Sequence, residues 1–363
     1  MALTVAIAPD SFKGSLDALA VALAIAEGWA SVRGEDDLRI LPQADGGEGT
    51  LVALAHYFPA ARLVDAGWVT GPDGRPVRGR WLRLPDGGAV VELAEVSGLS
   101  LMRRHDATGA TTRGLGEVIA HAVEAGAPIL TIALGGSACT DAGLGALRAL
   151  GLELYGADGS TIVDGGGALA DVRTVDTSRL KRRPAGGVAT LTDVTAPLLG
   201  PRGAAAVFAP QKGATPKQVA ELENALRHVS TMLGGAPEAP GAGAAGGTAY
   251  GFQALWGARL ESGALYVRRA SGLDAMLPEL DVIVTGEGQF DHQSTRGKVV
   301  GELLSLAAAA GVRTGVIAGQ ITMRPQGWSA ALVDVAGSVK EARRDPTRWL
   351  RIAGAQAASA LAG

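Results

Sequence analysis

The sequence predicts a two-domain α/β protein in which a second domain interrupts a Rossmann-like parallel-sheet domain. Three observations support this prediction: the length of 363 residues, the alternation of short apolar runs with helical patterns, and the division of those runs between the two ends of the chain. A chain of this length suggests about two domains, and each half can bury its own core. Continuous Val, Ile and Leu runs between helices are typical of a parallel sheet covered on both faces.

Five short apolar segments are predicted to be strands of one sheet. Two lie near the start of the chain and three near its end, at residues 4–8, 38–41, 282–285, 315–318 and 331–335. Helical patterns follow three of them, at about residues 15–29, 50–57 and 298–310. Neither group of strands makes a normal sheet by itself. Residues 1–63 and 271–363 are therefore predicted to form one discontinuous Rossmann-like domain.

The intervening residues, 64–270, are predicted to form an inserted α/β domain. Segments 89–94, 129–134 and 187–191 have the apolar character of strands, and the second leads into a glycine-rich loop and a helix. The Pro, Gly and Ala residues of segment 234–247 predict a loop or hinge.

The composition excludes several classes of protein. The formal net charge is −3 and no basic stretch is present, so nucleic acid is not an expected partner. The longest early apolar run, 18–26, is too short to span a bilayer, and the N-terminus lacks the basic region of a signal peptide. The single cysteine, Cys139, permits no intrachain disulfide. We expect a cytoplasmic protein that does not bind membranes; the sequence does not indicate an oligomeric state.

Three polar loops follow strands of the predicted discontinuous sheet, at the edge where open parallel sheets bind ligands. They are residues 9–15 (PDSFKGS), 45–50 (DGGEGT) and 286–298 (GEGQFDHQSTRGK). Their candidate site residues are Asp10, Ser11, Lys13, Asp45, Gly46, Gly47, Glu48, Glu287, Asp291 and Lys298. Carboxylates that hold Mg²⁺, lysines that offset negative charge and glycines that admit phosphate are the groups that phosphoryl transfer needs.

Several of these residues also have a structural interpretation. Ser15 is a better candidate for the N-cap of the following helix than for a ligand. Asp45 and Gly46 either serve the site or form a tight turn, and their position favours the site. Lys13 and Lys298 are either ligands of an anion or solvated lysines.

The inserted domain carries a further glycine loop between a predicted strand and a helix. It contains the candidate phosphate ligands Gly135, Gly136 and Ser137. The loop either binds an anion at the N-terminus of the helix or is a turn capped by Thr140 or Asp141. Cys139, in the same loop, is expected to be a small buried residue.

Asp193 follows the predicted strand 187–191. A carboxylate at a strand end is a candidate general base or metal ligand. Aspartate also starts turns, and Pro197 favours a turn here, so the pattern alone leaves both interpretations open.

Two motif searches give negative results. The chain lacks G-x-x-x-x-G-K-[ST], which excludes a P-loop kinase. A G-x-G-x-x-G match occurs at Gly241, Gly243 and Gly246, but the Gly- and Pro-rich residues before it cannot form a central strand. The dinucleotide-binding interpretation therefore loses its structural basis.

Seven segments taken together resemble the type 1 glycerate kinase family. In chain order they are APDSFKGSL, QADGGEGT, ATTRGLGEVI, LGGSACTDAGLGAL, TDVTAPLLGPRGAAAVFAPQKGAT, GAGAAGG and VTGEGQFDHQSTRGK. The resemblance implies ATP- and Mg²⁺-dependent phosphorylation of D-glycerate, usually to 2-phosphoglycerate in bacterial members, at a site between two α/β domains. Ala196 and Gln289 depart from the family pattern.

Within this interpretation we assign Asp193, Lys13 and Asp45 to catalysis, Asp45 and Asp291 to the metal, and the other candidates to substrate or phosphate. Three alternatives remain at this stage. They are a kinase for another small hydroxy or sugar acid, a nucleotide-binding oxidoreductase that uses the Gly241 loop, and a non-catalytic sensor of small acids.

Overall fold

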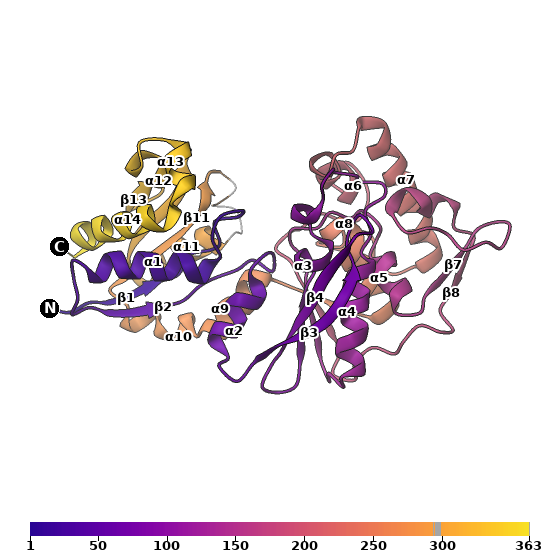
Figure 1. The fold of residues 1–363 in the computed structure, drawn as a ribbon, viewed down its shortest axis with the longest axis horizontal. Helices are drawn as coiled ribbons and strands as arrows, with labels where there is room; N and C mark the ends of the chain where they lie inside the picture. The colour runs from indigo at the N-terminus through magenta and orange to yellow at the C-terminus, as the bar shows by residue number, and fades with distance from the viewer. Residues whose placement is uncertain (293, 295–298, 363) are drawn as a thin grey trace. The chain divides into compact units, whose positions relative to one another are not determined.

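The computed structural model describes residues 1–292, 294 and 299–362 (Figure 1). The chain divides into two compact units. Unit 1 comprises Met1–Asp45, Val52–Tyr57 and Ala264–Gly363, and unit 2 comprises Gly46–Leu51 and Phe58–Gly263. Both units are mixed α/β structures with parallel strands, which confirms the predicted fold class. The predicted domain ranges, 1–63 with 271–363 and 64–270, stay a prediction about independent folding.

The sheet of unit 1 has five parallel strands in the order β13-β12-β11-β1-β2. Their bounds are β1 Thr4–Ile7, β2 Asp37–Ile40, β11 Val282–Phe290, β12 Arg313–Ile321 and β13 Trp328–Ala331. Counted along unit 1, the spatial order is 2-1-3-4-5, which is a doubly wound arrangement with its switch point between β1 and β11. Ligands bind outside the carboxyl ends of the strands at such a point.

Helices cover both faces of this sheet. They are α1 Ala18–Ala30, α2 Thr50–Tyr57, α9 Gly263–Ser271, α10 Leu273–Met276, α11 Val299–Ala310, α12 Leu332–Val335, α13 Val339–Arg344 and α14 Pro346–Leu361. Alternate residues of β1 face opposite sides, as a strand requires. Val5 and Ile7 pack in the core that α1 and α14 cover, whereas Ala6 and Ala8 pack in the core that includes α11.

Helices α1 and α14 lie side by side (Figure 1) because each has a glycine where they touch. A Cβ atom on Gly28 would lie 1.9 Å from the carbonyl oxygen of Arg351, and one on Gly354 would lie 2.3 Å from that of Ile25. Any larger residue at these positions would force the two helices apart.

The structure corrects two predicted elements of unit 1. Residues 331–335 are not a strand: β13 ends at Ala331, which pairs with Ala318, and residues 332–335 form α12. A short apolar run does not distinguish strand from helix by periodicity. The first helix begins at Ala18 rather than near Ser15, and Asp17 is its N-cap, since its Oδ1 accepts from the Ala20 N–H at 2.8 Å. Ser15 is therefore not the cap.

Unit 2 is built on a six-stranded sheet in the order β10-β9-β6-β5-β4-β3. Its strands are β3 Arg62–Thr70, β4 Pro76–Arg83, β5 Ala89–Glu92, β6 Leu130–Ala133, β9 Val188–Leu191 and β10 Arg259–Glu261. The four strands from β5 to β10 in this order are parallel, and β4 and β3 are antiparallel. The three predicted strands of the insert are thus present, whereas the β3–β4 hairpin was not predicted.

Six helices and a small two-stranded sheet complete unit 2. They are α3 Ala94–Ser97, α4 Arg113–Glu124, α5 Leu144–Ala149, α6 Ala204–Phe208, α7 Pro216–Leu233, α8 Ala244–Trp256, β7 Glu153–Tyr155 and β8 Thr174–Asp176. The glycine match at Gly241 follows α7 and a loop, not a strand, so the structural basis for dinucleotide binding is absent there. Among the described residues, no helix is long and apolar enough to cross a membrane.

Candidate active site

The loop after β1 carries the first group of predicted residues. Asp10 and Ser11 are both buried, at 9% and 7% exposure, and the Asp10 backbone N–H donates to the Gly286 carbonyl at 2.8 Å. Phe12 and Leu16 close the loop on itself, since the Phe12 N–H donates to the Leu16 carbonyl at 2.9 Å. This closure delays the start of α1 and keeps Asp10 and Ser11 at the end of the strand.

The structure brings the charged residues of two predicted loops together. Lys13 Nζ lies 3.8 Å from Asp45 Oδ2, on an exposed part of unit 1. The pKa of Asp10 is raised to about 7, first by burial and then by the negative charge of Asp45, while Lys13 lowers it in part. A smaller effect in the same direction comes from Glu287. An additional cation beside Asp10 would relieve this repulsion.

The third predicted loop is only partly joined to this group. Glu287 is buried at 8% exposure near the end of β11 and lies close enough to Asp10 to raise its pKa. Asp291 lies just beyond β11, where its backbone N–H donates to Ser294 Oγ at 2.9 Å. Lys298 lies outside the described residues.

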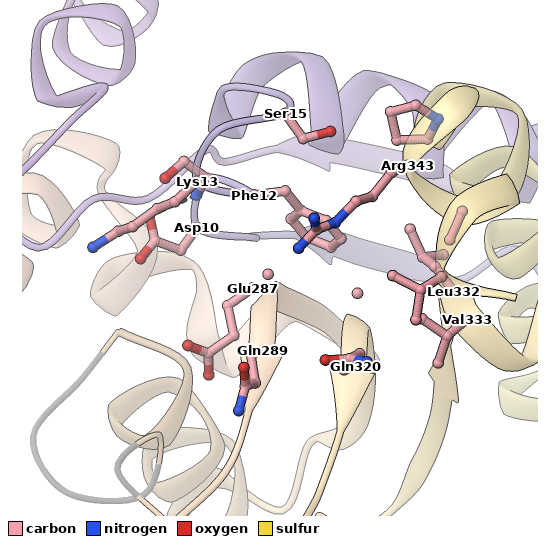
Figure 2. A pocket seen from close by; sticks show the side chains of 16 residues that line it. Asp10, Phe12, Lys13, Ser15, Glu287, Gln289, Gln320, Leu332, Val333 and Arg343 are labelled. Atoms are coloured by element: carbon pink, nitrogen blue, oxygen red, sulfur yellow. Dashed lines mark hydrogen bonds between the residues drawn. The ribbon is translucent and has the colours of Figure 1, made fainter. Parts of the chain in front are cut away.

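A cavity of about 330 Å³ opens beside these residues within unit 1 (Figure 2). Asp10, Lys13 and Glu287 lie on one side of it, and Leu332 and Val333 on the other. The sequence interpretation missed the second side entirely, because α12 and α13 carry no motif and reach the site only through packing.

The glycine loops of unit 2 contact each other. The Gly135 N–H donates to the Gly46 carbonyl at 2.9 Å, and a Cβ atom on Gly135 would lie 2.4 Å from the Gly47 Cα. Glu48 accepts from Ser100 Oγ at 3.1 Å. The close backbone approach explains the glycines structurally and also places the second predicted loop beside Gly135, Gly136 and Ser137.

The helix that follows this glycine loop does not offer its N-terminus to an anion. Helix α5 begins at Leu144, and the buried carboxylate of Asp141 accepts from the Gly143 and Gly145 N–H groups. The N-cap residue is Gly143, which makes no side-chain cap hydrogen bond, so neither Thr140 nor Asp141 is the cap itself. The Asp141 carboxylate nevertheless satisfies two N–H groups at the start of the helix. Cys139 is fully buried, as expected, and burial raises the pKa of its thiol well above the usual value.

Two buried charges of unit 2 support these loops, and the sequence interpretation missed both. Lys212 is 2% exposed and donates to Ser137 Oγ at 2.9 Å and to the Cys139 carbonyl. Burial lowers its pKa to about 8. Glu92 accepts from the Gly49 N–H at 3.0 Å and the Leu51 N–H at 3.1 Å, and burial raises its pKa to about 7. The only signal in the sequence was the lysine within the segment PQKGAT.

Asp193 is half-buried and follows β9, as predicted. The turn beyond the strand is closed by Thr192, whose Oγ1 accepts from the Val194 N–H at 3.2 Å and whose own N–H donates to the Glu261 carbonyl at 2.9 Å. Thr192 therefore closes this turn.

Within residues 1–292, 294 and 299–362, no three His, Cys, Asp or Glu side chains are grouped closely enough to hold a metal ion. The carboxylates of the first loops therefore do not form a metal cage made of protein ligands alone.

Comparison with known proteins identifies relatives along almost the whole chain. The model of the glycerate kinase family matches residues 5–362. A glycerate 2-kinase of Escherichia coli K12 is 40% identical over 304 residues, which cover 81% of this chain and 79% of that protein. A glycerate kinase of Bacillus subtilis 168 is 41% identical over 325 residues, which cover 87% and 85%.

A solved structure has the same fold. The crystal structure of a candidate glycerate kinase 2 from Salmonella typhimurium LT2 aligns with a TM-score of 0.81 at 36% identity. The alignment covers 100% of this chain and 99% of that one.

Proposed function

Because this chain belongs to the glycerate kinase family, we propose that it transfers the γ-phosphoryl group of ATP to D-glycerate, giving ADP and 2-phosphoglycerate. The names of the relatives support the reaction, and the name glycerate 2-kinase supports the product. The structural observation that carries the proposal is the group formed by Asp10, Lys13 and Asp45 at the switch point of the unit 1 sheet. Phosphoryl transfer depends on such positioning and charge compensation.

Mg²⁺ bound with ATP fits this group of residues. Burial and the charge of Asp45 raise the pKa of Asp10, which is the behaviour of a carboxylate pair that a divalent cation would stabilise. Mg²⁺ is usually held by one or two carboxylates together with substrate phosphates, so a cage of three protein ligands is not needed. We propose Asp45 and Asp291 as its ligands, as the sequence suggested, and add Asp10. When bound, Mg²⁺ would neutralise charge on the phosphates.

The chain's own residues would carry the remaining steps. Lys13, exposed beside Asp45, would contact a phosphate oxygen or the acceptor carboxylate. Asp193 would accept the proton of the glycerate hydroxyl as its oxygen bonds to phosphorus. The other proposed phosphate and substrate ligands are Ser11, Gly46, Gly47, Glu48, Gly135, Gly136, Ser137, Glu287 and Lys298.

A kinase for another small hydroxy or sugar acid is the second candidate. We also propose that the enzyme works in the cytoplasm, in keeping with its single cysteine. Its substrates would be ATP and a small acid.

A coupled assay of ADP release with a panel of hydroxy acids tests the proposal. We expect turnover with D-glycerate, loss of turnover with EDTA and recovery with Mg²⁺. ADP formation that does not depend on any acid, or turnover that requires a nicotinamide cofactor, would contradict the proposed function. Turnover with a different acid alone would favour the second candidate.

A further inference from the structure

A second hollow lies within unit 2, at the end of its sheet that is opposite to the glycine loops. Its walls come from segment 177–185, which leads into the amino end of β9, and from the last residues of α8. Asp193 follows the other end of the same strand, so the hollow is separate from the proposed kinase site. Its volume is about 430 Å³, which is within the range of sites that hold small organic ligands.

The hollow carries positive charge without a matching negative charge. Arg182 and Arg183 line it and are exposed, and neither makes an ion pair or a hydrogen bond within the described part of the chain. The preceding cation differs, because Lys181 Nζ lies 3.0 Å from Glu124. No acidic side chain is found among the described residues that line the hollow. Two adjacent guanidinium groups therefore lack a counter-charge that an anionic ligand would supply.

The backbone on both sides of these two arginines is held in place. Before them, the Lys181 N–H donates to the Leu150 carbonyl at 2.8 Å, and the Lys181 carbonyl accepts from Trp256 Nε1 at 3.1 Å. After them, the Gly186 N–H donates to the Pro128 carbonyl at 2.8 Å. A ligand that binds the two arginines therefore does not have to order the loop that carries them, which lowers the entropic cost of binding.

Most of the remaining lining is apolar. Trp256 and Pro184 are buried, whereas Leu180 and Leu255 are half-buried. The two leucines leave carbon surface that a ligand would remove from water. The hollow thus combines two cations with an apolar wall, and this combination suits an anion that has a short carbon chain.

A small anion fits the hollow better than a polyanion does. The three consecutive cations at 181–183 are too few to follow a nucleic-acid backbone, and the net charge of −3 opposes its approach. Trp256 is only 4% exposed, so the hollow does not present the protruding aromatic side chain that peripheral membrane proteins use. A guanidinium group pairs in two-pronged fashion with a phosphate or a carboxylate, and two neighbouring guanidinium groups can hold one of each.

We propose that this hollow binds a small organic acid that carries both a phosphate and a carboxylate group. Arg182 and Arg183 would hold the two anionic groups, and Leu180 and Leu255 would contact the carbon chain. The proposal does not depend on the kinase function, because no residue of the hollow belongs to the proposed kinase site.

Titration of the whole protein with phosphonopropionate tests the proposal. This probe joins a phosphonate to a carboxylate through a short hydrocarbon chain. Calorimetry gives its Kd, and tryptophan fluorescence gives an independent readout, because Trp256 lines the hollow. We expect saturable binding, and binding of propionate that is at least about tenfold weaker because the phosphonate is missing.

A matched pair of variants locates the binding. Arg182→Glu/Arg183→Glu reverses both charges of the hollow. Its control, Arg62→Glu/Lys217→Glu, makes the same change in net charge at exposed positions of unit 2 outside the hollow. We expect the Kd for phosphonopropionate to rise at least about tenfold in the first variant and less than about twofold in the control, since salt screens distant charges. Arg182→Gln/Arg183→Gln removes the charges without reversing them and decides the matter if the glutamate variant does not fold.

The remaining outcomes are also decisive. Absence of binding to the wild type, or unchanged binding in the folded Arg182 and Arg183 variants, overturns the proposal. Binding that is lost in Lys13→Ala but kept in those variants would place the ligand in the kinase site and overturn it too. Retention of an oligonucleotide or of anionic vesicles without any binding of phosphonopropionate would overturn it in favour of a polyanion. If the wild type releases no ADP with any acid but the titrations behave as expected, this site stands and the proposed kinase function fails.

Discussion

Replacing Lys212 with methionine would isolate the role of the buried cation beneath the glycine loop of unit 2. Lys212 donates to Ser137 and Cys139 in that loop. Methionine has a similar length but no charge and no donor, so it fills the space without making either bond. We expect Lys212→Met to fold with moderately altered stability and to lose most of its activity.

The expected stability follows from two opposing effects. Burial lowers the pKa of Lys212 from its usual 10.5 to about 8, so keeping the amine protonated at neutral pH costs about 3 kcal/mol, which methionine removes. Loss of the donor to two buried oxygen atoms costs about 1–3 kcal/mol for each. The two effects offset each other to within about 3 kcal/mol, in contrast to the removal of one partner of a tight buried ion pair.

The effect on activity has no such compensation. If the loop contacts a phosphate or the acceptor, Lys212→Met removes a positive charge from behind it and loosens its position. The loss of one charge-assisted interaction is worth about 2 kcal/mol, or roughly thirtyfold in kcat/KM. Lys212 would act here as a positioning residue, so the loss should appear in kcat/KM out of proportion to the change in unfolding free energy.

Coupled ADP release gives kcat/KM, and urea titration gives the free energy of unfolding. Lys181→Met is the matched control, because Lys181 is an exposed lysine of the same unit that pairs with Glu124 at 3.0 Å. Its kcat/KM should stay within about twofold of wild type. A folded Lys212→Met enzyme with kcat/KM within about threefold of wild type would refute the reasoning and leave Lys212 with a packing role only.

Four further predictions follow from the site and the fold. Lys13→Ala should remove about 2 kcal/mol or more of transition-state stabilisation, measured as a fall in kcat/KM in the ADP-release assay. Wild-type kcat/KM values for both ATP and the acceptor would make Lys13 a solvated lysine. Asp193→Asn should lower kcat roughly a hundredfold with little change in ATP affinity, whereas loss of Mg·ATP binding would make Asp193 a metal ligand instead. Because burial raises the pKa of Glu92 from its usual 4.5 to about 7, the folded state holds a proton that the unfolded chain loses, and its contribution to the unfolding free energy should fall by about 3 kcal/mol as pH rises through this window. Glu92→Gln should flatten that slope in urea titrations at pH 5 and pH 7, and an unchanged slope would contradict the assignment. A polypeptide that joins residues 1–63 to 271–363 through a short Gly/Ser linker should melt cooperatively, and a chain that stays unfolded would count against the predicted domain ranges.

The sheet of unit 1 was predictable because its signal is local. Strands buried on both faces need apolar residues at every position, so an apolar run such as 282–285 predicts a buried strand from its own residues. The division of five strands between the two chain ends then required one shared sheet. The same reasoning failed at residues 332–335, because an apolar run of that length suits a helix as well, and only the pairing of Ala331 with Ala318 fixes where the strand ends.

The site was predictable on one side only. Polar residues after β1 and within β11 stand out against the apolar strands that precede them. The opposite wall consists of ordinary helix residues such as Val333 and Arg343, whose role depends on where α12 and α13 pack. Phe12 and Arg343 both line the cavity but lie about 330 positions apart along the chain. No pattern in the sequence indicates that two residues so far apart line the same cavity.

Lys212 and Glu92 show why glycine-rich loops alone were an incomplete description of unit 2. Glycine lets the Gly135 and Gly47 backbones approach each other, but it contributes no side chain to hold them in place. The holding contacts come from two buried ionisable groups, with Glu92 accepting from the Gly49 N–H and Lys212 donating to Ser137. Burial moves both pKa values toward neutrality, so the charged form of each group carries a penalty. Apolar residues would avoid that penalty, and since a well-packed apolar replacement of a buried charge is often neutral or stabilising, stability alone does not account for the pair. Fixing the position of backbone donors and acceptors for the proposed phosphate contacts would account for it.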